Sequence, residues 1–368
     1  MKLLVYLLLL SPLYSQTGQD DLQFGKLWPQ IRRYQEKGTL EKMIAARRAE
    51  IIAKKNHWKA KLSTAEDPNL THLLKEGTLT PADNGKGGAY ILSDKQNTPL
   101  YVIKSFDEEA LCLNNRKHFA SPFNDRAFRI HEEIPLYRSV QAEALCASIA
   151  MLLHLNHLTP PTHLAILEHE AFFDITDRSK KLTTRLGPPT REKLCSVQPY
   201  LPNTEILTNL VDEWTEETFL SNIDLEDFEN LMILIWLFYD TDAHAENIHA
   251  QKDEQGIYHL IKIDNGLTFP NQNTRLLNAL AYLPNAIAPL SQKGIKRIQK
   301  LPLKKITERI AFFEMDDALA AFEERVHQLQ TLAKKEDITL REIDDHLQLL
   351  QRPKKKNSAT PALITFSH

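Results

Sequence analysis

The segment that most restricts the fold is an uninterrupted apolar run of nine residues, from Leu231 to Tyr239. With the acidic residues before it, in "DLEDFENLMILIWLFYD", the run predicts a helix whose second half is apolar on every side. That half must lie inside a protein core. The polar string "DAHAEN", from Asp242 to Asn247, follows at once, so the sequence predicts polar side chains at the end of a buried helix.

The sequence after this string predicts a β-hairpin. Between Asn247 and Asp264 the chain reads "IHAQKDEQGIYHLIKI", with a turn expected between Asp253 and Gly256. Residues at equal distances from the turn of an antiparallel pair face each other across roughly 5 Å. The midpoint between Asn247 and Asp264 falls inside or next to this turn, so we expect their side chains to lie side by side at the open end of the hairpin.

These side chains suit the chemistry of phosphoryl transfer. The amide oxygen of Asn247 and the carboxylate of Asp264 match a hard divalent cation such as Mg²⁺, which prefers oxygen ligands. The carboxylate of Asp242, in the loop just before the hairpin, is free to orient or deprotonate an attacking hydroxyl group. His244, in the same loop, is expected to organise the loop by hydrogen bonding rather than to bind a metal.

A source of positive charge is expected in the first half of the chain. There "GTLTPADNGKGGAYILSDKQNTPLYVIKSFDEE" predicts two short strands, Ala89 to Ser93 and Leu100 to Lys104, after a glycine-rich turn. Lys104 is a candidate phosphate ligand, and the N–H groups of the turn can approach phosphate oxygens because its glycines carry no side chain. These glycines are Gly85, Gly87 and Gly88. Each feature alone also fits an ordinary hairpin, and their order along the chain favours the nucleotide site.

A strand-rich first half and a helix-rich second half predict an α+β fold with a cleft between the halves. We expect a helical extension at 16–76, a β-rich N-lobe at about 77–200, a helical C-lobe at about 201–350 and a disordered tail at 351–368. The segment from Ser139 to Leu155, "SVQAEALCASIAMLLHL", predicts the main helix of the first half. Three widely spaced cysteines are expected to be buried thiols rather than a disulfide framework or a metal site.

The N-terminal sequence "MKLLVYLLLLSPLYSQTGQ" predicts a signal peptide at 1–15, because one lysine precedes an apolar run that is too short to cross a bilayer of roughly 30 Å. The expected location is therefore secreted or extracytoplasmic. ATP is scarce outside cells, so an ATP-dependent activity would require delivery to an ATP-containing host or lumenal compartment.

The charge of the chain restricts its partners. A net charge of −3 argues against a general nucleic-acid binder. Residues 20–61 nevertheless hold eleven Lys or Arg against five acids. This basic stretch is either a solvated helix face or a surface for an anionic membrane.

Four patches together resemble the atypical kinases of the phosphatidylinositol 3- and 4-kinase superfamily, and most closely the type II phosphatidylinositol 4-kinases and their bacterial relatives. They are "GKGGAYILSDKQNTPLYVIKSFDEE", "AEALCASIAMLLHLNHLTPPTHLAIL", "DTDAHAEN" and "IDNGLTFP", of which the last is the most specific. The similarity runs in order from about Thr78 to Leu350. It implies a two-lobed, protein-kinase-like fold and an enzyme that uses ATP with Mg²⁺ or Mn²⁺.

Position by position, the resemblance implies how the nucleotide is held. Lys104 would contact the phosphates, and Glu143 would orient Lys104. The hinge segment from Val197 to Tyr200 would stack against adenine. The long separation between Lys104 and Glu143 implies an insertion that contains "NNRKHFASPFND", and it leaves Glu132 and Glu133 as alternatives to Glu143.

The resemblance also implies the catalytic roles. Asp242 would be the catalytic aspartate, with His244 supporting the transferred phosphoryl group. Asn247 and Asp264 would hold the metal. Ala243 stands where many relatives have an arginine, which leaves open whether the acceptor hydroxyl belongs to a protein or a phosphoinositide. The alternatives to an active phosphotransferase are a nucleotide-binding pseudokinase or adaptor and an enzyme that transfers AMP.

Overall fold

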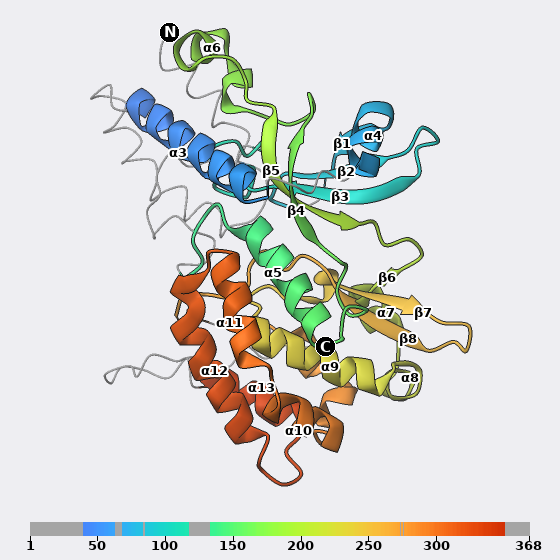
Figure 1. The fold of residues 1–368 in the computed structure, drawn as a ribbon. Helices are drawn as coiled ribbons and strands as arrows, with labels where there is room; N and C mark the ends of the chain where they lie inside the picture. Colours follow the sequence, from blue (N-terminus) through green and yellow to red (C-terminus); the bar gives the residue numbers. More distant parts are fainter. Residues whose placement is uncertain are drawn as a thin grey trace, which may run out of the picture.

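The computed structural model describes residues 40–62, 68–83, 85–117, 133–272, 274 and 276–349. It contains an N-lobe built on a five-stranded antiparallel sheet and a larger, mainly helical C-lobe (Figure 1). The predicted α+β fold with two lobes is confirmed. The expected signal peptide, the first part of the helical extension and the expected tail lie outside the described residues.

The sheet of the N-lobe has the strand order β1-β2-β3-β5-β4. Its strands are β1 (Thr78–Pro81), β2 (Ala89–Ser93), β3 (Pro99–Ser105), β4 (His163–Glu168) and β5 (Glu192–Pro199). The register places Lys104 of β3 opposite Ser196 of β5. Because side chains alternate between the faces of a strand, Lys104 and its neighbour Ile103 point to opposite faces. Ile103 lies in an apolar cluster with α4 (Pro68–Glu76), and Lys104 faces the other way.

Helix α5 (Ser139–Leu152) lies between the sheet and the helices of the C-lobe (Figure 1). It contacts β4, β5 and α11 (Leu303–Phe312). The helix is rich in alanine, which has the highest helix propensity and lets neighbouring elements approach closely. Most of its residues are buried, and they include Glu143, a carboxylate that needs a partner inside the protein.

The predicted hairpin is confirmed, but its register is one residue away from the expected one. Strands β7 (Ile248–Lys252) and β8 (Tyr258–Lys262) pair Ile248 with Lys262, so Asn247 lies opposite Ile263 and not opposite Asp264. The reason is the turn, which has three residues from 254 to 256 and Gly256 at a φ of +90°. A three-residue loop with glycine in the left-handed region centres the hairpin on residue 255.

The C-lobe is arranged around helix α9 (Leu225–Phe238), whose second half is buried on every side as the sequence predicts. A short strand, β6 (Glu205–Ile206), extends the hairpin into a three-stranded sheet. The remaining helical elements of the lobe are α7 (Leu207–Glu213), α8 (Glu216–Asn222), η4 (Ala245–Asn247), η5 (Ala279–Tyr282), η6 (Pro284–Ile287), α10 (Gln292–Gln299), η7 (Asp316–Ala318), α12 (Leu319–Leu332) and α13 (Leu340–Leu349).

Helix α3 (Leu40–Lys61) belongs to the predicted helical extension and packs on both lobes. Trp58 is fully buried and lies against the rings of Phe312 and Phe313 in the C-lobe. Lys55 pairs with Glu192 of β5 at 2.6 Å. Nearer its start, α3 reaches the excursion between β4 and β5, which contains η3 (Ile175–Arg178) and α6 (Lys180–Leu186), through hydrogen bonds from Arg48.

Two further sequence expectations can be compared with the structure. The cysteines Cys112, Cys146 and Cys195 are all buried and unpaired, as predicted. Among the described residues, no helix is both long enough and apolar enough to span a bilayer.

Replacement of Trp58 by alanine tests whether α3 is part of the folded unit. Because the indole is fully buried between the two phenylalanines, we expect Trp58→Ala to lower the free energy of unfolding by about 3–5 kcal/mol. Urea denaturation measures the loss. Asn56→Ala, at an exposed position of the same helix, is the control and should change it by less than about 0.5 kcal/mol. Equal stability of the two variants would mean that α3 does not dock on the protein.

Candidate active site

Three distant parts of the chain meet at the ammonium group of Lys104. Its Nζ lies 2.5 Å from Oε1 of Glu143 on α5 and 2.9 Å from Oδ1 of Asp264, just after β8. The pairing with Glu143 answers the question that the sequence left open between Glu143 and Glu133, while Glu132 is outside the described residues. The site therefore joins the N-lobe sheet, helix α5 and the C-lobe hairpin.

The electrostatics of this group follow from its burial and its charges. Burial raises the pKa of the Glu143 carboxyl, against the attraction of Lys104. Burial also opposes the charge of Lys104, but the carboxylates of Asp264 and Glu143 outweigh it and raise the pKa of the ammonium group. For Asp264, burial is outweighed by Lys104, which lowers its pKa to about 2. Asp264 is therefore ionised at neutral pH and remains 48 % exposed in its side chain.

The string "DAHAEN" forms a compact loop in front of the hairpin. Asn247 Nδ2 donates to the main-chain oxygen of Asp242 at 2.9 Å and to its Oδ2 at 3.2 Å. The same nitrogen lies 3.2 Å from Nε2 of His244, which in turn is 3.7 Å from Oδ1 of Asp242. Asn247 is thus the centre of the loop and fixes Asp242, while His244 remains partly exposed beside it.

The pKa of Asp242 is shifted in the direction opposite to that of Asp264. Burial raises the pKa of its carboxyl, and the like charge of Asp264 raises it further. A carboxylate whose pKa moves towards neutrality takes up a proton more readily in a reaction. The pKa values of the two aspartates are therefore shifted in opposite directions.

Two residues that support this loop were not identified from the sequence. Lys262 is buried at the end of β8 and pairs with Oδ2 of the fully buried Asp240 at 3.0 Å. Asp240 accepts the N–H of Asp242 at 2.8 Å through Oδ1, and Lys262 donates to the main-chain oxygens of Ile263 and Asp264. The pair therefore fixes the backbone of both aspartates. The available signal was a charged residue in each of two otherwise apolar segments, since a buried charge needs a partner.

The glycine-rich turn lies between β1 and β2, and its glycines have different surroundings. Gly85 has a φ of +75°, and a side chain added at Gly85 or Gly87 would meet no described atom within 4 Å. At Gly88 an added Cβ would lie 2.4 Å from Cβ of Glu108. The N–H of Gly88 donates to the main-chain oxygen of Glu108 at 2.8 Å. Gly88 is thus required for packing of the turn, whereas Gly85 and Gly87 are the glycines with open space beside them.

The first and last residues of the predicted hinge segment, Val197 and Tyr200, have different surroundings in the structure. The side chain of Val197 is fully buried in the cluster that faces α4, on the opposite face of the sheet from Lys104, so it cannot contact a ligand beside Lys104. Tyr200 is 38 % exposed, and its N–H donates to the oxygen of Leu100 at 2.9 Å. The connection from Tyr200 to β6 joins the two lobes, so Tyr200 is the part of the prediction that lies at the hinge.

The donor atoms of Asn247 and Asp264 fit a divalent cation. Nδ2 of Asn247 is engaged by Asp242, so Oδ1 is the amide atom that remains for a metal. Asp264 adds an ionised and half-exposed carboxylate. Amide and carboxylate oxygens are the ligands that Mg²⁺ and similar cations accept, and the rest of the coordination shell is commonly supplied by water and phosphate.

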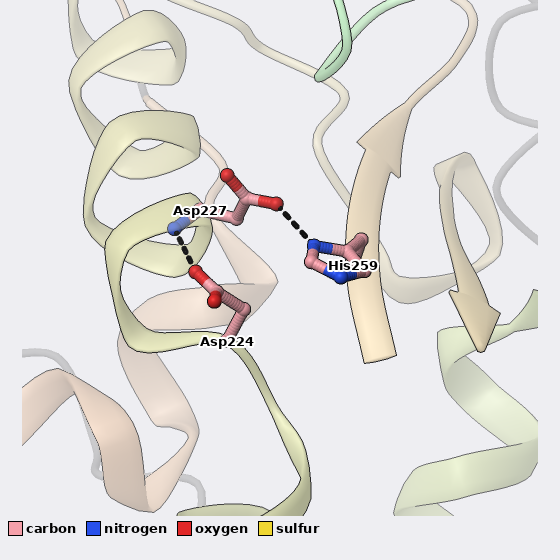
Figure 2. Close-up of side chains that lie close together, drawn as sticks. All are labelled: Asp224, Asp227 and His259. Atoms are coloured by element: carbon pink, nitrogen blue, oxygen red, sulfur yellow. Dashed lines mark hydrogen bonds and ion pairs between the residues drawn. The ribbon is translucent and has the colours of Figure 1, made fainter. Parts of the chain in front are cut away.

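A separate group of polar side chains, Asp224, Asp227 and His259, lies at the start of α9 (Figure 2). Asp224 caps the helix by accepting the N–H of Asp227 at 2.8 Å. The carboxylate of Asp227 lies 2.7 Å from Nδ1 of His259 and 2.9 Å from Nε2 of His157. These hydrogen bonds fasten β8 to the first turn of α9 and account for the cluster, so we assign no metal to it.

The Lys262–Asp240 pair can be tested by removing one charge. Lys262→Met leaves Asp240 buried without its cation, and we expect the free energy of unfolding to fall by about 3–5 kcal/mol. Adding Asp240→Asn should recover part of this loss, because the amide keeps an oxygen for the N–H of Asp242. Urea denaturation of both variants measures this. A loss below about 1 kcal/mol in the single variant would indicate a pair no more important than an exposed one.

Comparison with known proteins shows what the chain is similar to. No protein-family model matches the chain. In sequence it is similar to phosphatidylinositol 4-kinase gamma 6 and gamma 7 of Arabidopsis thaliana, with 26 % identity over 246 and 243 residues. Each alignment covers 61 % of this chain and only 35 % and 33 % of the relatives, so the chain spans about a third of their length.

Among solved structures, the Golgi casein kinase with Mn/ADP bound is similar over 76 % of this chain and 77 % of that chain, with 14 % identity and a TM-score of 0.42. The sequence relatives confirm the resemblance that the four motifs predict.

Proposed function

We propose that the protein is an ATP-dependent phosphotransferase that uses Mg²⁺ or Mn²⁺ and acts on a hydroxyl group of a protein or a phosphoinositide. The observation that carries the proposal is the position of Lys104 between the carboxylates of Glu143 and Asp264, at 2.5 and 2.9 Å. Phosphoryl transfer depends on charges held in fixed positions. Here the ammonium group of Lys104 is fixed next to the carboxylate of Asp264, which is suited to bind a metal ion.

In the proposed reaction, the γ-phosphoryl group of ATP moves to the acceptor hydroxyl. The bond from the acceptor oxygen to phosphorus forms, and the bond from phosphorus to the bridging oxygen of ADP breaks. Asp242 takes the hydroxyl proton, which agrees with its raised pKa, caused by burial and by the charge of Asp264. Asn247 holds the Asp242 carboxylate, and Lys104 binds phosphate oxygens.

Asn247 and Asp264 would hold the divalent cation, whose chemistry is to polarise phosphoryl oxygens and neutralise their charge. The open side of the glycine turn, at Gly85 and Gly87, would receive the phosphates by their backbone N–H groups. Tyr200 would lie beside the adenine ring.

Ala243 leaves the identity of the acceptor open. This residue is fully buried and its oxygen accepts the N–H of Ala279, so position 243 presents no basic side chain to an acceptor. His244, which is 38 % exposed in its side chain, is the adjacent group that an acceptor would meet. The names of the sequence relatives favour a phosphoinositide as the first acceptor to test, with a protein hydroxyl as the second.

Asp264→Asn is the sharpest test of the site. It removes the charge that pairs with Lys104 and the carboxylate ligand, and we expect turnover with ATP and Mg²⁺ to fall by roughly 10²-fold or more. The measurement is transfer of radiolabelled γ-phosphate to phosphoinositide vesicles and to protein acceptors, with circular dichroism to verify the fold. Glu254→Gln, an exposed carboxylate at the hairpin tip, is the control and should retain full activity.

Full activity of Asp264→Asn would refute the metal assignment. Mass spectrometry of the acceptor separates the alternatives, because the mass gained is that of a phosphoryl group in the proposed reaction and that of AMP in an AMP transferase. Nucleotide binding without any transfer by the wild-type protein would identify a pseudokinase or adaptor instead.

A further inference from the structure

The N-terminus of α5 is capped by a residue from a distant segment. The residue that precedes the helix, Arg138, makes no side-chain capping hydrogen bond. Instead, Glu109 accepts the N–H of Ser139 at 2.6 Å through Oε1 and the N–H of Tyr137 at 3.1 Å through Oε2. Ser139 is the first residue of the helix, so Glu109 places a carboxylate where the unpaired N–H groups and the positive end of the helix dipole favour one.

Glu109 and Lys104 hold the same helix at two points. They are five residues apart, with Lys104 in β3 and Glu109 in the segment after it, and their partners Ser139 and Glu143 are four residues apart, about one helical turn. The chain between them is fixed by Asp107, which pairs with the buried Lys193 of β5 at 2.8 Å. A shift of the start of α5 therefore moves Glu143 relative to Lys104.

Helix α3 supplies the positive charge beside this cap. Lys54 donates to the main-chain oxygen of Tyr137 and interacts electrostatically with Glu109. Its ammonium group also lies 6.0 Å from the centre of the Phe106 ring. The neighbouring Lys55 points to Glu192 and not to α5, so only one of the two consecutive lysines reaches the cap.

The same end of α5 is joined to the segment after Asp264. Arg138 donates to the main-chain oxygen of Phe269 and pairs with Asp317 at 2.8 Å. A Cβ added at Gly266 would lie 2.8 Å from Cβ of Ser139, which shows how closely this segment passes the first residue of the helix. The start of α5 thus contacts the N-lobe, helix α3 and the segment that carries Asp264.

We propose that Glu109 is a positioning residue of the nucleotide site, and that Lys54 of α3 holds it in place. Glu109 fixes the start of α5 so that Glu143 meets Lys104. Helix α3 therefore acts on the nucleotide site indirectly, through Lys54 and the start of α5. The role of Glu109 in holding α5 does not depend on the reaction, whereas its effect on ATP binding rests on the proposed function.

The test compares Glu109→Gln and Lys54→Met with Lys55→Met in the full chain. Hydrogen exchange measures protection of the α5 amides from 139 to 143. We expect exchange there to rise by about tenfold or more in Glu109→Gln and to a smaller extent in Lys54→Met, because each loses a charged hydrogen bond. Lys55→Met, which loses only the pair with Glu192, should leave these amides unchanged.

A second measurement separates positioning from a general loss of stability. Titration calorimetry gives the affinities for ATP with Mg²⁺ and for adenosine. A displaced Glu143 weakens the hold of Lys104 on phosphates, so we expect Glu109→Gln to lower the ratio of ATP affinity to adenosine affinity by about tenfold. Wild-type protection of α5 in Glu109→Gln, an unchanged ratio, or equal effects in Lys55→Met would overturn the proposal. If the wild type binds no ATP, the proposed function fails, and hydrogen exchange still decides the role of Glu109.

Discussion

The site depends on a single ammonium group that lies between two carboxylates. Lys104 comes from the sheet, Glu143 from α5 and Asp264 from the end of the hairpin, so one cation joins three elements of two lobes. Because Asp242 lies close enough to Asp264 to feel its charge, the carboxylates outnumber the cation. This excess negative charge is what a divalent cation would neutralise, and it makes the donor set of Asn247 and Asp264 suitable for one.

The geometry of this group is maintained by buried polar contacts further out. On the side of the C-lobe, Lys262 and Asp240 fix the backbone before and after the hairpin. On the side of the N-lobe, Glu109 fixes the first turn of α5. A charged side chain that is removed from water needs a partner. These contacts therefore restrict the backbone to the arrangement that provides one. The backbone at the exposed Asp264 is in this way held by Lys262, which is buried together with its partner Asp240.

The sequence predicted residues that belong to motifs in a recognisable order along the chain. It did not predict residues whose role depends on packing. The pairing of Lys104 with Glu143 was expected from the family resemblance, with Glu132 and Glu133 as alternatives. The hairpin itself was predictable, but its register was not. The residue pairs of a hairpin are centred on its loop, and a loop of three residues and a loop of four differ by half a residue in the position of that centre. Val197 was placed at the hinge from the family pattern, and only the strand pairing shows that its side chain faces α4.

Glu109 illustrates why such contacts escape a reading of the sequence. The sequence "SFDEEA" does not distinguish its three acidic residues. In the structure Asp107 pairs with Lys193, Glu108 accepts a hydrogen bond from the hydroxyl group of Tyr90, and Glu109 caps α5. Their partners lie far away in the chain, and alternation along an irregular segment does not predict them. Three adjacent carboxylates, of which Asp107 and Glu108 are buried and Glu109 is partly buried, have partners in three different elements, so this short segment after β3 links the sheet, the glycine turn and α5. Displacement of any one of these elements therefore strains the others at the site of Lys104.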